Sequence, residues 1–160
     1  MEENGLNREM IEKLCGMALE MRSRSYVPYS HFRVGAALLA QDGRIFTGCN
    51  VENASYSPCS CAERTAFVKA ISEGVHDFLA IAISGGLEGG ELEFCPPCGV
   101  CRQVMSEFCT GRFPIYLAKS KEEYVVHTLD EMLPFRFTVE NLHTSVKLQV
   151  GKMDEEAEDG

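Results

Sequence analysis

Residues 33–48 read Arg-Val-Gly-Ala-Ala-Leu-Leu-Ala-Gln-Asp-Gly-Arg-Ile-Phe-Thr-Gly, and this stretch decides the fold class. Arg33 to Ala40 form a nearly continuous apolar run, which is typical of a strand buried on both faces. Asp42-Gly43 is a two-residue hairpin signal, and we expect Arg44 to Gly48 to return as a second strand. The stretch therefore predicts an antiparallel hairpin within a sheet that is covered on both sides.

The rest of the chain alternates between helical and strand patterns. Residues 8–24 fit a helix that Asn7 can cap, because apolar residues repeat on one face at helical spacing, namely Ile11, Leu14, Cys15 and Ala18. Further helices are predicted over residues 62–73, 98–108 and 128–133, and further strands over residues 78–84, 114–118 and 123–127. Strands interleaved with helices favour a layered α/β fold with a mixed sheet, in which helical crossovers join the strands after the hairpin.

The length and composition are those of an ordinary globular domain. The chain has 160 residues, of which 45% are hydrophobic and 24% are charged. We expect a single domain over residues 1–150 and an acidic, disordered tail over residues 151–160. The formal net charge is −9, from 24 acidic and 15 basic residues. This acidic balance argues against a nucleic-acid partner, because such binding depends on neutralising phosphates with Lys and Arg.

The sequence carries no signal for a membrane or a secretory route. Residues 1–15 lack a basic segment followed by an apolar one, and no apolar run approaches the roughly 18 residues that cross a membrane. We therefore expect a soluble, cytoplasmic protein whose eight cysteines stay reduced. Five of them form two clusters, and clustering in a reducing compartment indicates metal binding or catalysis; they are Cys59 and Cys61, and Cys95, Cys98 and Cys101.

Two short motifs carry the predicted chemistry, Cys61-Ala62-Glu63 and Pro97-Cys98-Gly99-Val100-Cys101. Each falls at the start of a predicted helix, where unpaired N–H groups and a partial positive charge favour the thiolate, the form of cysteine that binds zinc. Cys98 and Cys101, three residues apart in one helical turn, point the same way. With Cys61 as a third ligand, one tetrahedral position stays open for water, which is the pattern of a catalytic zinc site.

A structural zinc site is the alternative, because Cys59 or Cys95 could supply a fourth sulfur. Glu63 favours catalysis over that alternative. A carboxylate two residues after a ligand can lie beside the zinc-bound water, accept its proton and deliver it to a leaving amine. The combination Cys-x-Glu with Pro-Cys-x-x-Cys is the signature of zinc deaminases in its all-cysteine form.

The sequence resembles the small, homotetrameric cytidine deaminases from residue 25 to residue 143. Four stretches carry the resemblance in order: residues 29–38 (YSHFRVGAAL), 48–54 (GCNVENA), 61–66 (CAERTA) and 97–104 (PCGVCRQV). The resemblance implies a three-layer α/β/α fold with a five-stranded mixed sheet and one zinc ion per subunit. It also implies the hydrolysis of cytidine and 2′-deoxycytidine to uridine and 2′-deoxyuridine plus ammonia, in pyrimidine salvage.

The resemblance implies roles for individual residues at the zinc. Cys61, Cys98 and Cys101 match the zinc ligands, and Glu63 matches the catalytic residue that moves the protons. Three thiolates on Zn²⁺ leave a site charge of −1, which makes the ion a weaker Lewis acid. We expect Arg64 to offset that charge by donating hydrogen bonds to the ligand sulfurs, as the matching arginine of the family does; Arg102 is the other candidate by position.

Residues that match the substrate-binding positions of the family are Phe32, Asn50, Glu52, Tyr56, Ala62 and Phe137. The resemblance implies that Phe32 stacks against the pyrimidine and that Asn50 and Glu52 hydrogen-bond the ribose 3′-hydroxyl. The Ala62 backbone matches a group that reads the base edge, and Phe137 matches an aromatic that reaches a neighbouring subunit's site. Phe135 is a rival for that last role. Taken singly, these residues could also be core or loop residues.

Three other functions compete with a nucleoside deaminase. A polynucleotide editor would have to hold a phosphate backbone, which the acidic chain and a glutamate near the 3′-hydroxyl both disfavour. A structural zinc protein would have four protein ligands and would not need Glu63. A pyrimidine-binding module without chemistry would not need the intact catalytic carboxylate.

Overall fold

A five-stranded mixed sheet forms the centre of the molecule. The computed structural model describes residues 2, 3 and 5–142, so the acidic segment 151–160 lies outside the described residues. The strands are β3 (Phe32–Ala40), β4 (Ile45–Cys49), β5 (Phe78–Leu87), β6 (Pro114–Ala118) and β7 (Tyr124–Thr128). Their order is β4-β3-β5-β6-β7, and only β5 and β6 run parallel within it. The predicted mixed sheet is confirmed.

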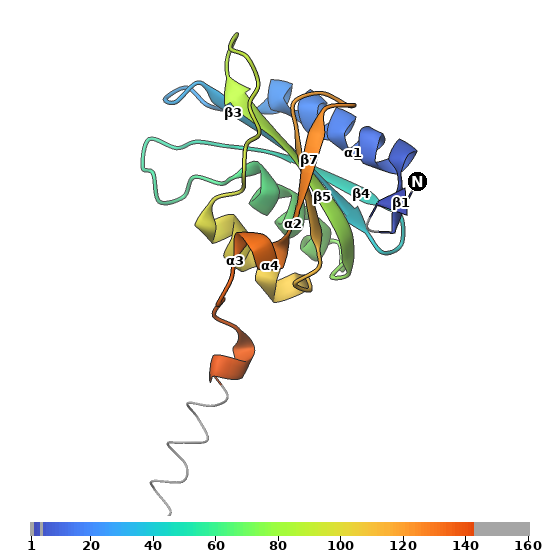
Figure 1. Cartoon of the computed structure of the whole chain (residues 1–160). Coiled ribbons are helices and arrows are strands. Elements are labelled where there is room, and N and C mark those ends of the chain that lie inside the picture. Colours follow the sequence, from blue (N-terminus) through green and yellow to red (C-terminus); the bar gives the residue numbers. More distant parts are fainter. Residues whose placement is uncertain (1, 4, 143–160) are drawn as a thin grey trace, which may run out of the picture.

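Helices cover both faces of this sheet. The helices are α1 (Arg8–Met21), α2 (Ala62–Ser72), α3 (Gly99–Phe108) and α4 (Leu129–Met132), with a 3-10 turn, η1 (Arg22–Arg24), after α1. The helix α1 lies on one face, whereas α2 and α3 lie on the other (Figure 1). The three-layer α/β/α arrangement is therefore confirmed. The short pair β1 (Glu2–Glu3) and β2 (Leu6–Asn7) was not predicted.

Alternate residues of the central strands pack into two separate cores. In β3, Leu38 lies in the core beneath α2 and α3, and Leu39 lies in the core beneath α1. In β5 the same alternation places Ile81 and Ile83 on one side and alanines on the other. The continuous apolar runs that predicted strands buried on both faces therefore have a direct structural reason.

Two features of the sheet differ from the prediction. The strand β5 continues three residues beyond the expected end at Ser84, because Gly85 and Gly86 pair with Val34 and Arg33 of β3. Glycines usually weaken a strand, which is why these two indicated a loop. The strands β6 and β7 form an antiparallel pair joined by a short turn, and not by the expected helical crossover.

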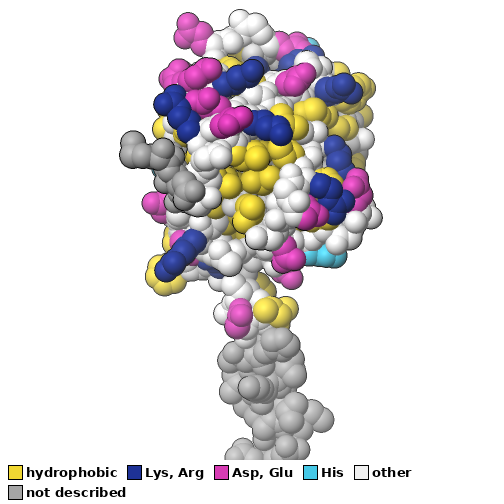
Figure 2. Space-filling model, turned by 90° about the vertical axis from the view of Figure 1, so that its right-hand side faces the viewer, with side chains coloured by type: hydrophobic (Ala, Val, Ile, Leu, Met, Phe, Trp, Pro, Cys, Tyr) yellow, Lys and Arg dark blue, Asp and Glu magenta, His cyan; other side chains and the backbone are white. Residues whose placement is uncertain are grey.

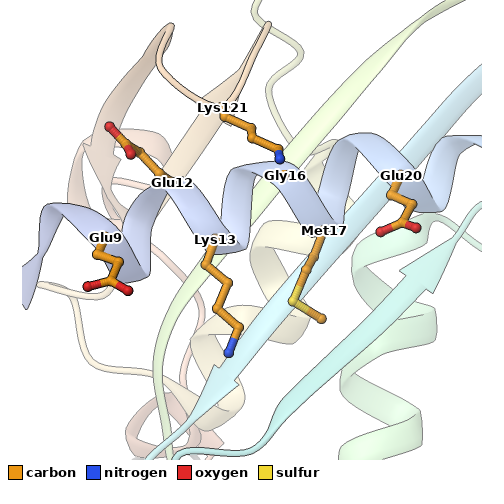
Figure 3. A pocket seen from close by; sticks show the side chains of 7 residues that line it. All are labelled: Glu9, Glu12, Lys13, Gly16, Met17, Glu20 and Lys121. Atoms are coloured by element: carbon orange, nitrogen blue, oxygen red, sulfur yellow. The ribbon is translucent and has the colours of Figure 1, made fainter.

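The turn between β6 and β7 lies against α1. Lys121 in this turn extends over Gly16 of α1, in a hollow of about 430 Å³ along the helix (Figure 3). A Cβ on Gly16 would lie only 2.8 Å from the Lys121 Cε, so the missing side chain makes room for the lysine methylenes. None of the predicted site residues lines this hollow. It lies on the helix that covers the opposite face of the sheet from α2 and α3.

Local signals at the element ends behave as expected. The Asn7 Oδ1 accepts a hydrogen bond of 2.9 Å from the Met10 N–H, which caps α1. Gly43 in the β3–β4 turn and Gly74 after α2 have φ angles of +87° and +80°, in the left-handed region that favours glycine. None of the helices within the described part of the chain is both long and apolar enough to cross a membrane.

Gly48 in β4 sets the distance between the sheet and the start of α2. A Cβ at this position would collide with the Ala62 carbonyl oxygen and lie 2.6 Å from the Ala66 nitrogen. Both atoms belong to the helix backbone, which cannot move aside as a flexible side chain could. The first turn of α2 therefore approaches the sheet this closely only because residue 48 has no side chain.

Replacing Gly48 by alanine should destabilise the fold by about 2 kcal/mol or more, since the added methyl group overpacks a backbone contact. Gly90→Ala is the control, because a Cβ there meets only ordinary contacts at 3.5 Å. Chemical unfolding of the two variants measures the difference. Equal stability of Gly48→Ala and Gly90→Ala would contradict the close approach.

Candidate active site

The N-termini of two helices meet at three cysteines. Cys61 is the N-cap of α2, Cys98 is the N-cap of α3, and Cys101 lies in the first turn of α3. The Cys61 and Cys98 sulfurs are 3.8 Å apart, and those of Cys98 and Cys101 are 3.6 Å apart. All three sulfurs lie within 4.8 Å of one another. The two motifs that sequence spacing singled out are thus brought together in space.

The spacing of the three sulfurs fits a zinc ion. A Zn–S bond is about 2.3 Å long, so two sulfurs of a tetrahedral site are about 3.8 Å apart. The Cys61–Cys98 and Cys98–Cys101 sulfur separations, 3.8 and 3.6 Å, agree with that geometry. Cys61, Cys98 and Cys101 would hold the ion, and the fourth position would remain open.

Within the described part of the chain, neither Cys59 nor Cys95 lies in this group of three sulfurs. The Cys59 sulfur accepts a hydrogen bond of 3.2 Å from the Asn53 N–H instead. Burial raises the pKa of Cys95 to about 11, which keeps that thiol protonated. A closed site with four sulfurs therefore has no support from the geometry, and three ligands with an open position are the pattern of catalytic zinc.

Positive charge reaches the sulfurs from Arg64. Its Nη2 lies 3.7 Å from the Cys61 sulfur and donates a 3.0 Å hydrogen bond to the Cys59 carbonyl oxygen. A hydrogen bond from Cys101, together with Arg64, lowers the pKa of Cys61 to about 5, whereas the same bond and burial raise the pKa of Cys101. One thiol of the group thus ionises readily, as a metal ligand must.

Arg102 does not share this role. Its Nε donates to the Pro97 carbonyl oxygen at 2.8 Å, and its Nη1 donates to the Met132 carbonyl oxygen at 2.6 Å. These bonds tie the loop before α3 to the end of α4. Of the two arginines that follow the motifs, the structure places only Arg64 against a ligand sulfur.

Glu63 lies in the first turn of α2 and is only 4% exposed. Burial raises the pKa of this carboxyl group to about 7, and the nearby Cys61 sulfur acts in the same direction. A divalent cation on the sulfurs would act in the opposite direction. A carboxyl group that titrates near neutral pH can both accept and donate a proton, which is what a general acid–base residue requires.

A short stretch of paired backbone links the three-cysteine group to the segment that contains Asn50 and Glu52. Val51 and Ser60 exchange two backbone hydrogen bonds of 2.9 and 3.0 Å, one residue before Cys61. The Asn50 side chain bridges the start of β3: its Oδ1 accepts from the Val34 N–H at 2.9 Å, and its Nδ2 donates to the Phe32 carbonyl oxygen at 2.8 Å. One amide hydrogen and one lone pair of Asn50 remain for a ligand.

Glu52 is held in a fixed orientation by the loop before β3. Its Oε2 accepts hydrogen bonds from the Tyr29 and Ser30 N–H groups at 3.1 and 3.2 Å, and its Oε1 accepts from the Ser30 hydroxyl. Since a carboxylate has about four acceptor positions, one remains for a further donor. Together with Tyr56 these residues line a hollow of about 290 Å³.

Of the other predicted substrate contacts, three have exposed side chains and one is buried. Phe32 begins β3 and is 36% exposed, and the Tyr56 ring lies edge-on to Tyr29 with centroids 6.4 Å apart. Ala62 is fully buried as the first residue of α2, so only its backbone could meet a ligand. Phe137 is half-exposed, and its carbonyl oxygen accepts a 3.0 Å hydrogen bond from Gln103 Nε2.

For two residues at the site, Ser30 and Gly48, the sequence alone did not indicate a role. Ser30 orients Glu52, and Gly48 allows α2 to approach the sheet. Both lie inside the stretches that carry the family resemblance, so their position in those motifs was the available signal. Phe135 has a φ of +51° and a fully exposed side chain, so it remains a rival to Phe137.

Known proteins resemble the chain in both sequence and structure. Residues 8–117 match the family model described as the cytidine and deoxycytidylate deaminase zinc-binding region. A cytidine deaminase of Sporosarcina psychrophila is 49% identical over 132 residues, which cover 82% of this chain and 94% of that protein. The crystal structure of cytidine deaminase from Burkholderia pseudomallei is similar with a TM-score of 0.71 and 42% identity, over 78% of this chain and 97% of that one. The crystal structure of cytidine deaminase from Mycobacterium tuberculosis is similar with a TM-score of 0.67 and 39% identity, over 79% of this chain and 95% of that one.

The sulfur geometry predicts which cysteines hold the metal. Cys101→Ser should lose the one zinc ion per chain, because it removes a buried ligand, whereas Cys95→Ser should retain it. Metal analysis of the purified proteins measures the zinc content. Loss of zinc from Cys95→Ser would instead indicate a site with four cysteine ligands.

Proposed function

The chain belongs to the zinc-dependent family of cytidine and deoxycytidylate deaminases, and we propose that it removes the amino group of free cytidine and 2′-deoxycytidine by hydrolysis. The observation that carries this proposal is the buried carboxyl group of Glu63, two residues after one member of a three-sulfur group with zinc geometry. When bound, zinc lowers the pKa of a water molecule and so supplies the nucleophile at neutral pH.

Glu63 moves the protons in the proposed reaction. It accepts a proton from the attacking water and passes it to the ring nitrogen beside the aminated carbon. The oxygen of the water forms a bond to that carbon, and Glu63 then takes the second proton from this oxygen and delivers it to the amino group. The bond between carbon and nitrogen breaks, ammonia leaves, and uridine or 2′-deoxyuridine remains. Burial raises the pKa of Glu63 and a bound cation would lower it, and these opposing effects suit a carboxyl group that acts alternately as base and acid.

The proposed substrate is a nucleoside because of the groups beside the metal site. Phe32 offers an aromatic face to the pyrimidine, and the Ala62 backbone would read the base edge. The remaining acceptor position of Glu52 and the free amide hydrogen of Asn50 suit a ribose hydroxyl. The 3′-hydroxyl is present in both cytidine and 2′-deoxycytidine, so both are proposed substrates. Tyr56 lines the hollow beside Glu52.

The same carboxylate disfavours a nucleic-acid substrate. A 3′-phosphate in place of the 3′-hydroxyl would bring negative charge against Glu52, which is ionised because hydrogen bonds from Ser30 lower its pKa. The net charge of −9 also disfavours the binding of a nucleic acid. A free nucleoside that enters pyrimidine salvage is therefore the proposed substrate class.

We further propose a homotetramer in which each site is completed by a neighbouring subunit through Phe137. Support comes from the half-exposed ring of Phe137 and from a patch of hydrophobic side chains ringed by charged ones on one face of the molecule (Figure 2). Patches of this kind mark association surfaces. Each subunit would be one cytoplasmic domain, residues 1–150, with an acidic tail.

Glu63→Gln should lower the rate of ammonia release from cytidine by at least about 100-fold, because an amide cannot transfer the protons. Zinc should stay bound in this variant. Glu73→Gln, at the far end of α2, is the matched control and should keep full turnover. The panel of substrates includes 2′-deoxycytidine, cytidine monophosphate and single-stranded DNA. Activity on the strand but not on the nucleosides would overturn the proposed function.

Arg64→Gln should lower turnover by about tenfold with zinc still bound, because the variant loses the charge beside the Cys61 sulfur. The matched control is Arg44→Gln in the β3–β4 turn, where the side chain is exposed and paired with Asp42. Steady-state kinetics and zinc analysis of the two variants measure the effect. Wild-type turnover in Arg64→Gln would refute the proposed compensation of charge.

A further inference from the structure

Two carboxylates hold the loop that precedes Phe32, and only one of them belongs to the site described above. Glu52 binds this loop at Tyr29 and Ser30. Glu88 follows the last residue of β5, and it lies next to the loop because Leu87 is paired with Phe32 in the antiparallel ladder of β3 and β5. No motif in the sequence marks Glu88.

Glu88 contacts both residues that flank Phe32. Its backbone N–H donates a 2.9 Å hydrogen bond to the His31 carbonyl oxygen, and its Oε2 lies 3.4 Å from the His31 Nδ1. On the other side of Phe32, its Oε1 accepts a 2.5 Å hydrogen bond from the Arg33 Nε. A single residue therefore fixes the chain immediately before and immediately after the aromatic ring.

The conformation of His31 needs such a restraint. Its φ of +55° lies in the left-handed region, which costs a non-glycine residue free energy and persists only where the surroundings hold it. Besides the bond from Glu88, the His31 N–H donates to the Val27 carbonyl oxygen at 3.1 Å. The direction in which the chain enters β3, and with it the placement of Phe32, depends on this turn.

Arg33 connects Glu88 to the segment that follows α1. Its Nη1 donates hydrogen bonds of 2.9 Å to the Ser25 carbonyl oxygen and 3.3 Å to the Arg22 carbonyl oxygen, in the segment that follows α1. The Arg33 guanidinium also holds the pKa of Glu88 below its ordinary value, so that the carboxylate is charged. The loop is thus anchored to the segment that follows α1, the helix on the opposite side of the sheet from α2 and α3.

We propose that Glu88 is a positioning residue for Phe32, acting through His31 and Arg33 to hold the ring where it can stack on the pyrimidine. This inference rests on the proposed function, in which Phe32 is the base-stacking residue. Glu88 itself would touch neither substrate nor zinc. Its loss should therefore weaken the binding of substrate and leave the proton transfers by Glu63 unchanged.

The test compares Glu88→Ala with Glu73→Ala, which removes another exposed glutamate paired with an arginine at the far end of α2. In Glu88→Ala the KM for cytidine should rise about fivefold, which is the loss of binding expected when a partly exposed ion pair is removed. The kcat and the zinc content should stay at the wild-type values. Glu88→Gln, which keeps an acceptor for Arg33, should recover part of the loss. Glu73→Ala should leave KM unchanged.

A second measurement needs no substrate. Amide hydrogen exchange over residues 29–32 should be faster in Glu88→Ala than in Glu73→Ala, because the loop loses its anchor. Unchanged exchange in this segment, an unchanged KM, or a loss of kcat and zinc together with a higher KM would each overturn the inference. Failure of the wild-type protein to release ammonia from cytidine would instead overturn the proposed function, and the exchange measurement would still decide whether Glu88 orders the loop.

Discussion

The rest of the site depends on the meeting of two helix N-termini at three sulfurs. Three thiolates in contact repel one another, and each needs positive charge close by. A bound Zn²⁺ ion would supply two positive charges, the ends of α2 and α3 supply a partial positive charge through unpaired N–H groups, and Arg64 adds its charge at 3.7 Å from the Cys61 sulfur. The start of α2 can reach this position only because Gly48 leaves space for the helix backbone. Glu63 is buried for the same reason, since it lies in the helical turn that is pressed against the sheet.

The position of α2 also determines where the proposed substrate-binding segment lies. Ser60, which precedes the first ligand, is paired with Val51, and this pairing sets Asn50 and Glu52 beside the metal site. Asn50 in turn bonds to both sides of the β3 backbone at Phe32 and Val34. The metal ligands and the nucleoside contacts that we propose are therefore parts of one continuous hydrogen-bonded structure, and a shift in either would move the other.

Local patterns in the sequence were sufficient for most of the fold and for the grouping of the three cysteines that could hold a metal ion. The apolar runs, the Asn7 cap and the cysteine spacing depend on neighbouring residues, and the structure agrees with each. The extension of β5 through Gly85 and Gly86 could not be predicted, because it depends on pairing with a strand some fifty residues away. Arg64 and Arg102 were equivalent by position, and only their directions in the folded chain separate them. Glu88 went unnoticed for the same reason, since its partners come from another strand.

Carboxylates around the proposed nucleoside site have different tasks because their surroundings differ. Glu63 is buried, so it can hold or release a proton near neutral pH. Glu52 and Glu88 are at the surface, and hydrogen bonds from the loop and from Arg33 keep them ionised. Arg33 neutralises the charge of Glu88, whereas Glu52 accepts hydrogen bonds from neutral N–H and hydroxyl groups, so the charge of Glu52 makes this edge of the site unfavourable for phosphate. The chain would thus select an uncharged nucleoside by charge as well as by hydrogen bonding, without a separate element to exclude nucleotides.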